Sequence, residues 1–311
     1  MSQRKCPRTS LAAAASLVVC VAAFGQPAKP DAPFDTARLE QTTGMKGKLD
    51  TEEGVLRLSK PRKDVPVHVG QWQVPPFMGV GSWAAFTKAA DGQTMLMGDN
   101  ALFEDEVNAA MSAALDNGLQ VTALHNHFFF DQPKVYFMHI SGMGDASQLA
   151  QGVRKLEDAV EGVRSKHHLP SVTFGPAVPM PSHISGEPLE RILAHKGEAS
   201  DGMFKVTIGR KTSVHGDTMR NQMGVNTWAG FAGTDDNAVV DGDFAILESE
   251  LQPVLKSLRG AGINIVAIHQ HMTDEQPRMM FLHYWAQGKA QQLAQAVKSA
   301  LDLTHTAQEQ S

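Results

Sequence analysis

An internal duplication constrains this sequence more than any other feature. Residues 78–86 match residues 223–231 at an offset of 145, with six of the nine positions identical. After a one-residue difference in length, the offset becomes 144 and holds for the rest of the repeat. The later matches are Gly98-Asp99 with Gly242-Asp243, Glu104 with Glu248, Glu106 with Glu250, His125-Asn126-His127 with His269-Gln270-His271, and His139 with His283. Such a collinear series indicates that one structural unit occurs twice in the chain.

The ends of the two copies follow from the composition between them. Residues 168–188 carry five prolines, which is typical of an extended linker. At the start, a basic segment precedes a short apolar stretch, which is typical of a secretory signal peptide. The expected organisation is a signal peptide at 1–25, a linker at 26–33, repeat one at 34–165, a Pro-rich linker at 166–186, repeat two at 187–305 and a tail at 306–311.

Removal of the signal peptide would change the chemistry available to the mature chain. Both cysteines, Cys6 and Cys20, fall inside the segment that would be removed, so no thiolate ligand, disulfide or cysteine nucleophile would remain. Lipid attachment at Cys20 is the less favoured alternative, because residues 17–19 before it lack the usual small side chains. We therefore expect a periplasmic or secreted protein.

Composition excludes several classes of partner. The whole chain has a formal charge of −5, and loss of Arg4, Lys5 and Arg8 would leave the mature chain still more acidic. No Lys/Arg cluster occurs in its body, which argues against nucleic acid. No apolar run reaches the roughly 20 residues that a transmembrane helix needs, so we expect no transmembrane segment in the mature chain.

Each copy has the pattern of a mixed sheet-and-helix domain. The order is helix, strands, helix, strand, strand and helix, without strict βαβ alternation. The spacing predicts helices over 104–116 and 248–259, and short strands over 95–97 and 238–240. We therefore expect an α+β fold with two tandem copies of a mixed, largely antiparallel domain, each with a histidine-bearing β-hairpin.

The hairpin brings three histidines together in each copy. His125 and His127 are two residues apart in a strand and so share a face. A turn centred on Gln132 places His139 opposite His125, at a Cβ separation of about 4.5–5.5 Å. Leu119, Val121 and Ala123 share parity with them, so we expect the imidazoles at the end of a core-facing row. The same reasoning applies to His269, His271 and His283 in repeat two.

Three neutral imidazoles on one face suit a transition metal, with zinc or copper expected. The alternative is a polar network of core histidines held by backbone groups and water. Glu104 and Glu248 begin the helices before the histidine-bearing strands and are candidate further ligands, although acidic residues favour a first helical turn in any case. Asp99 and Asp243 are expected to be turn residues, and Trp83 and Trp228 to be core anchors.

The sequence also resembles a known family. The segments 121–127 (VTALHNH), 265–271 (IVAIHQH) and 281–285 (FLHYW) resemble the LppY/LpqO-like family of exported bacterial proteins and lipoproteins. The resemblance covers essentially the whole mature chain, and it implies an envelope location and a duplicated domain without a settled activity. Two departures are the poor lipidation context of Cys20 and the presence of Ser141 in copy one where copy two has Trp285.

Three functions remain open at this point. The first is an exported protein that binds a transition metal at a three-histidine site in each repeat, for metal handling. The second is a metal-dependent hydrolase that uses metal-bound water, with Glu104 or Glu248 as general base. The third is a small-molecule binding module without metal. The sequence does not decide whether the protein is an enzyme, and it gives neither its substrate nor its oligomeric state.

Overall fold

Antiparallel strands from both repeats join into one twelve-stranded sheet. The structure is a computed structural model that describes residues 34–304. The strand order is β1-β2-β5-β6-β9-β7-β16-β18-β15-β14-β11-β10, so repeat one contributes the first six strands and repeat two the last six. The expected signal peptide, the linker at 26–33 and the tail lie outside the described residues. The predicted α+β fold with a largely antiparallel sheet is confirmed.

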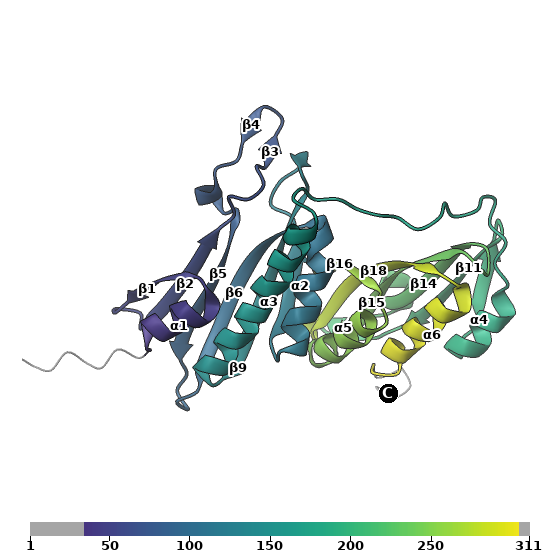
Figure 1. The fold of residues 1–311 in the computed structure, drawn as a ribbon. Helices are drawn as coiled ribbons and strands as arrows, with labels where there is room; N and C mark the ends of the chain where they lie inside the picture. The colour runs from purple at the N-terminus through teal and green to yellow at the C-terminus, as the bar shows by residue number, and fades with distance from the viewer. Residues whose placement is uncertain (1–33, 305–311) are drawn as a thin grey trace, which may run out of the picture. The chain divides into compact units, whose positions relative to one another are not determined.

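The two repeats have matching elements (Figure 1). Repeat one consists of α1 (Thr36–Thr43), β1 (Lys46–Asp50), β2 (Val55–Pro61), β5 (Gly81–Lys88), β6 (Thr94–Phe103), α2 (Glu104–Asp116), β7 (Gln120–His125), β9 (Val135–Gly144) and α3 (Ala146–Lys166). Repeat two consists of α4 (Gly186–Leu193), β10 (Gly197–Ser200), β11 (Met203–Gly209), β14 (Asn226–Gly233), β15 (Ala238–Leu247), α5 (Leu251–Gly260), β16 (Asn264–His269), β18 (Met279–Gly288) and α6 (Ala290–Leu301).

A small three-stranded sheet accompanies the main sheet in each repeat. In repeat one it comprises β3 (His68–Val69), β4 (Trp72–Gln73) and β8 (Asp131–Gln132), and in repeat two β12 (Thr212–Val214), β13 (Asp217–Met219) and β17 (Glu275–Gln276). The short 3-10 helices are η1 (Pro76–Met78), η2 (Asn221–Met223) and η3 (Glu248–Glu250). The predicted helix over 104–116 matches α2, whereas its counterpart is divided between η3 and α5.

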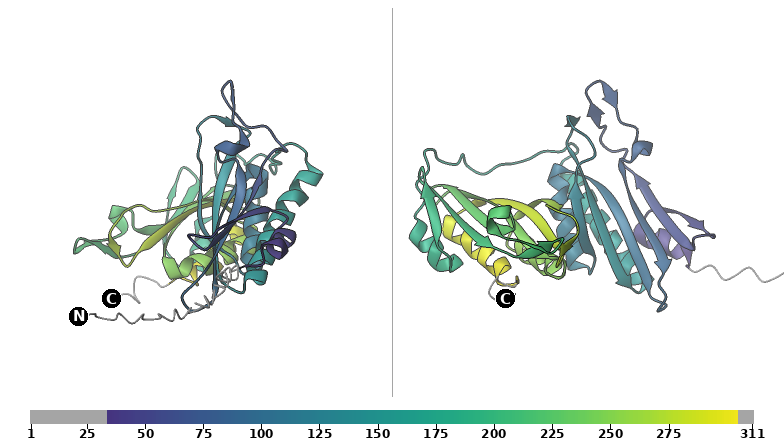
Figure 2. Two further views of the ribbon diagram at one scale, coloured as in Figure 1. Left: turned by 90° about the vertical axis from the view of Figure 1, so that its left-hand side faces the viewer. Right: turned by 180° about the vertical axis from the view of Figure 1, so that it is seen from behind.

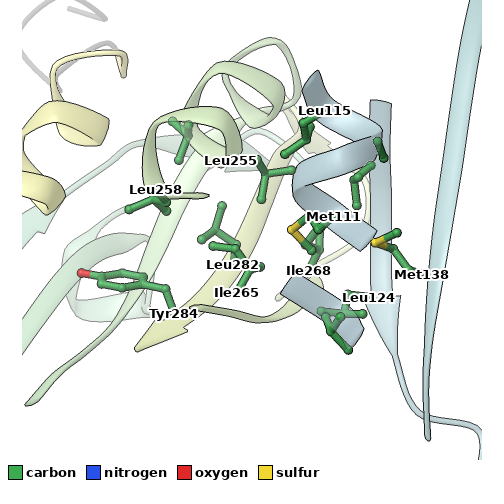
Figure 3. Packing of buried hydrophobic residues seen from close by; sticks show 14 of the residues in the cluster. Met111, Leu115, Leu124, Met138, Leu255, Leu258, Ile265, Ile268, Leu282 and Tyr284 are labelled. Carbon is green, nitrogen blue, oxygen red and sulfur yellow. The ribbon is translucent and has the colours of Figure 1, made fainter. Parts of the chain in front are cut away.

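The helices cover one face of the main sheet, as the opposite views in Figures 1 and 2 show. Apolar residues of the sheet and the helices form one buried cluster that spans both repeats. Figure 3 shows its centre, where Met111 and Leu115 of α2 lie near Leu255 of α5 and Leu282 of β18. No helix within residues 34–304 is long and apolar enough to cross a bilayer.

A β-bulge in each histidine-bearing strand changes which side chains face this core. In β7, Val121 pairs with Ile140 and Ala123 pairs with His139, so Thr122 is the extra residue. Val121 and Leu124 are both buried in the main cluster, which puts Ala123 and His125 on the opposite face. The same pattern occurs in β16 of repeat two, where the bulge lies between Ile265 and Ala267. The expectation that His125 continues a core-facing row of its own strand is therefore wrong, because the bulge reverses the alternation. On the second strand, His139 does follow the buried Val135 and Phe137, which belong to a smaller apolar cluster.

The register also differs from the predicted one. His125 pairs with Phe137 instead of His139, and His139 pairs with Ala123. This is a shift of two residues along β9. Since side chains repeat every two residues in a strand, such a shift preserves the face. His125 and His139 therefore remain neighbours, as diagonal partners on the face that the helices leave uncovered. His127, predicted in the same strand, lies in a bend after the end of β7.

Candidate metal centre

A row of paired residues runs across the uncovered face of the sheet in each repeat. In repeat two, Asp243 of β15 pairs with Trp228 of β14 on one side and with His283 of β18 on the other. His283 pairs in turn with Ala267 of β16. Because directly opposed residues share a face, the aspartate, the histidine and the tryptophan project to the same side. Repeat one has the equivalent row, Trp83, Asp99, His139 and Ala123.

Two expectations are corrected by this row. Asp99 and Asp243 are strand residues and not turn residues, because β6 and β15 continue to Phe103 and Leu247, well beyond the short strands predicted from sequence. Trp83 and Trp228 are half-buried beside the aspartates and are not core anchors. The matched Gly-Asp pairs in the two copies were the available signal for these acidic residues.

The repeat-two cluster consists of Asp243, His269, His271 and His283. The Nε2 atoms of His269 and His271 are 3.1 Å apart, and His271 Nε2 lies 3.5 Å from Asp243 Oδ2. One ligand atom from each of Asp243, His269 and His271 can be chosen so that all lie within 4.8 Å of one another. The ring of His283 stacks on that of His269 at a centroid distance of 4.9 Å. This group can hold a metal ion.

Aromatic packing and one backbone contact support the imidazoles. Phe281, which is fully buried, lies under His271 at a centroid distance of 3.5 Å with nearly parallel rings. His283 Nδ1 is 3.4 Å from the carbonyl oxygen of Gly242, which leaves its Nε2 for another partner. A small apolar cluster of Val225, Ala245, Met279 and Phe281 therefore supports one side of the site.

Burial sets the protonation of this cluster. The Asp243 side chain is only 4% exposed, and burial raises the pKa of its carboxyl to about 6, even though the nearby His283 opposes the shift. Burial, together with the charges of His283 and His271, lowers the pKa of His269 to about 4. The pKa of His271 is lowered as well, mainly by burial. At neutral pH His269 is therefore a neutral imidazole, the form that binds metals.

Two buried polar atoms of the cluster lack a hydrogen-bond partner. These atoms are Asp243 Oδ1 and His269 Nδ1. Unpaired buried groups of this kind cost on the order of 1–3 kcal/mol each, so they call for a physical explanation. A cation beside the carboxylate would offset the cost for Asp243.

The repeat-one cluster consists of Asp99, His125, His127 and His139 and is looser. The Nε2 atoms of His125 and His139 are 2.9 Å apart, but His139 Nε2 is 4.0 Å from Asp99 Oδ1. His127 lies over Phe137 at a centroid distance of 3.4 Å, and its pKa is lowered by burial and by His125. Asp99 Oδ1, like Asp243 Oδ1, is buried without a hydrogen-bond partner.

The candidate glutamates are placed differently from the histidines. Glu104 begins α2 and Glu248 begins η3, and both side chains are exposed. The structure records no hydrogen bond or ion pair between either glutamate and a described histidine. Each lines a pocket formed by residues of both repeats; Tyr136 also lines the pocket of Glu104, and Arg278 that of Glu248.

The neighbouring glutamates Glu106 and Glu250 have a structural role. Glu106 binds both terminal nitrogens of the buried Arg62, at 2.7 and 2.9 Å, and accepts a hydrogen bond from the Phe103 backbone. Glu250 binds Arg210 in the same way in repeat two. These buried pairs fix the strand-to-helix junctions that follow β6 and β15.

Comparison with known families agrees with the duplication. Residues 37–159 and 187–303 each match the model of one family, described as "Domain of Unknown Function (DUF1259)". The two matches confirm that the chain carries two copies of one domain. Comparison with curated proteins and with solved structures gave no match.

Proposed function

Because the chain belongs to the family described as "Domain of Unknown Function (DUF1259)", a description that assigns no activity, we propose a function from the geometry of its sites. The proposed function is binding of a transition metal ion by the histidines and the aspartate of each repeat. The ligands in repeat two are His269, His271, His283 and Asp243. The ligands in repeat one are His125, His127, His139 and Asp99.

The observation that carries this proposal is the position of Asp243 between two imidazoles. A carboxylate that is 4% exposed, lies 3.5 Å from His271 and has an unpaired oxygen is costly in a metal-free polar network. A divalent ion would neutralise the carboxylate and bind the lone pairs of the neutral imidazoles. The main alternative, a network of core histidines, would need a buried water to pair that oxygen, because no described protein group does so.

The donor set narrows the class of metal. It contains nitrogen and oxygen ligands, and no thiolate would remain in the mature chain if the signal peptide is removed as predicted. Imidazole with a carboxylate suits zinc, copper or iron, and zinc and copper remain the predicted ions. Glu104 and Glu248 stay predicted ligands, without support from a contact with the histidines.

Metal handling by an exported protein is the role we favour. Asp243 and Asp99 are the acidic groups beside the histidines, and a carboxylate bound to the metal is not free to act as a general base. The hydrolase alternative relied on Glu104 or Glu248, which have no recorded contact with the histidines. Export and the resemblance to the LppY/LpqO-like family remain predictions, which depend on residues 1–25 and on the histidine motifs.

Metal content tests the proposal directly. The mature chain, purified without an affinity tag, would be loaded with zinc or copper, desalted and measured by elemental analysis. We expect about two equivalents of one metal, falling by one in the Asp243→Asn variant and in the double variant His269→Ala/His271→Ala. The matched control is His167→Ala/His168→Ala, which removes two exposed histidines outside both clusters.

Two results would reject the proposal. The first is wild-type protein that takes up neither zinc nor copper on titration. The second is an equal loss of metal in the control and in the cluster variants, because this would indicate non-specific binding by surface histidines. Circular dichroism of each variant establishes that the fold is retained.

A further inference from the structure

An apolar groove opens directly beside the repeat-two cluster. Its volume is about 470 Å³, and its lining includes His283, Val239, Val266, Ala267, Asp241 and Trp285. His283 is therefore shared between the cluster and the groove. Trp285 is two residues further along β18 on the same face, about 7 Å from His283.

The two repeats differ at the residues of this groove. Ser141 occupies the position of Trp285 in repeat one, and Met97 occupies that of Asp241. Phe174 from the segment between the repeats contacts Trp285, with ring centroids 6.5 Å apart. The tryptophan of the groove is therefore a property of repeat two, and it also contacts a segment outside both repeats.

The lining specifies the chemistry of an occupant. A ring that lies against Trp285 and Val266 would remove apolar surface from water, which favours binding. Asp241 and Asp243 make this face acidic, so a second negative charge on the occupant is disfavoured. A single anionic head can be neutralised by the metal at the cluster. The fitting ligand has one metal-binding head and an uncharged aromatic or branched apolar body.

We propose that the repeat-two site binds a small organic acid or similar chelating ligand, whose head lies on the metal and whose apolar body lies in the groove against Trp285. This inference rests on the proposed metal function. Repeat one, with Ser141 in place of the tryptophan, would bind metal without selecting such a body. The two repeats would then differ in ligand selectivity while sharing a ligand set.

Two hydroxamates that differ only in their bodies test the inference. Acetohydroxamate carries a methyl group and benzohydroxamate a phenyl ring on the same chelating head. We expect the zinc-loaded wild-type protein to bind benzohydroxamate about tenfold more tightly at one site per chain, as measured by calorimetry. In Trp285→Ser, which carries the repeat-one residue, the preference should fall to about one, while zinc content and acetohydroxamate affinity stay unchanged.

Further variants keep the test decisive if Trp285→Ser does not fold. Val266→Asp places a charge on the 37%-exposed groove wall and should also abolish the preference. Trp72→Ser, which removes a 46%-exposed tryptophan in repeat one, is the control and should leave the preference intact.

Failure of the inference differs from failure of the metal proposal. If zinc binds but the two hydroxamates bind equally, or the preference survives in Trp285→Ser and Val266→Asp, the groove proposal is wrong and the metal proposal stands. The groove proposal is also wrong if benzohydroxamate binds equally well to zinc-free His269→Ala/His271→Ala. If the wild-type protein takes up no metal, both proposals are wrong.

Discussion

Each Gly-Asp pair combines a steric requirement with a chemical one. A Cβ atom on Gly242 would overlap the Trp228 carbonyl oxygen and the hydroxyl of Tyr284, and one on Gly98 would lie 2.8 Å from the Trp83 carbonyl oxygen. The glycine therefore lets two strands approach closely immediately before the aspartate that joins the histidines. The sequence shows the Gly-Asp pair in both copies. It does not indicate that β15 extends far enough to place Asp243 opposite His283.

The glycine requirement predicts a stability difference between two neighbouring strands. Gly242→Ala should destabilise the protein by about 2 kcal/mol, because Tyr284 is fully buried and has no room to move. The matched control is Gly230→Ala on β14, where a Cβ atom would meet nothing closer than 3.7 Å and where repeat one already has Ala85. Urea unfolding measures both variants. Equal free energies of unfolding for the two variants would contradict the steric argument.

A second prediction at the residue scale concerns Lys60. Its ammonium group binds the buried Glu157 at 2.8 Å and Glu161 at 2.7 Å. Burial opposes the charge of Lys60, but these hydrogen bonds outweigh burial and raise its pKa. The hydrogen bond from Lys60 is the main cause that lowers the pKa of Glu161. We expect Lys60→Met to cost about 2 kcal/mol at pH 7, because it leaves a buried carboxylate without its cation.

The cost of Lys60→Met should depend on pH with a definite sign. A carboxyl group whose pKa is lowered by folding stabilises the folded state at pH values above its ordinary pKa. This stabilisation is lost as the pH falls through the pKa of the folded state. The difference between wild type and Lys60→Met should therefore shrink below about pH 4. It should also shrink in strong alkali, as pH rises through the raised pKa of Lys60. Unfolding curves from pH 3 to 8 measure the change on the acid side, with Lys63→Met at an exposed lysine as the control. A difference in free energy of unfolding that does not depend on pH would contradict this argument.

At the scale of elements, the bulge explains why part of the site was predictable and part was not. The two-residue periodicity of strands places His125 and His139 on one face in any register that differs by an even number, and His127 follows two residues after the end of β7. The clustering therefore follows from sequence even though the predicted pairing of His125 with His139 is wrong. Nothing in the sequence at Thr122 or Val266 marks the bulge. The face of the sheet from which His125 and His269 project therefore does not follow from sequence.

The bulge also predicts opposite effects of two one-residue changes in β16. Deletion of Val266, the extra residue, joins Ile265 and Ala267 into a regular ladder, so His269 and His271 keep their face and the metal site is retained. Insertion of one alanine after Ile268 reverses the face of His269 and displaces His271, and it should remove about one equivalent of metal. Elemental analysis with circular dichroism compares the two. Loss of metal in the deletion, with the fold intact, would show that the bulge itself shapes the site.

At the scale of the whole chain, the duplication and the order of helices and strands follow from sequence, because matched segments and helical spacing are local signals. The continuity of one sheet across both copies does not follow from sequence. It depends on the pairing of two edge strands, β7 and β16, at one residue pair, Leu124 with Ile268. Amide side chains reinforce this junction. Gln252 of α5 accepts from the Val121 N–H at 3.0 Å and donates to its carbonyl at 2.8 Å, and Asn108 of α2 accepts from the Ile265 N–H at 3.2 Å.

This junction predicts how the two repeats unfold together. One buried core spans both repeats, so the wild-type chain should unfold in a single transition. Gln252→Leu leaves both polar backbone groups of Val121 without their side-chain partner, which should cost about 2 kcal/mol. Combining it with Asn108→Leu should broaden calorimetric unfolding into two transitions, because each repeat keeps its own helices and strands while their coupling weakens. The control is Gln292→Leu on the exposed face of α6. If the junction variants unfold as the control does, the apolar core and not the amide bonds couples the repeats.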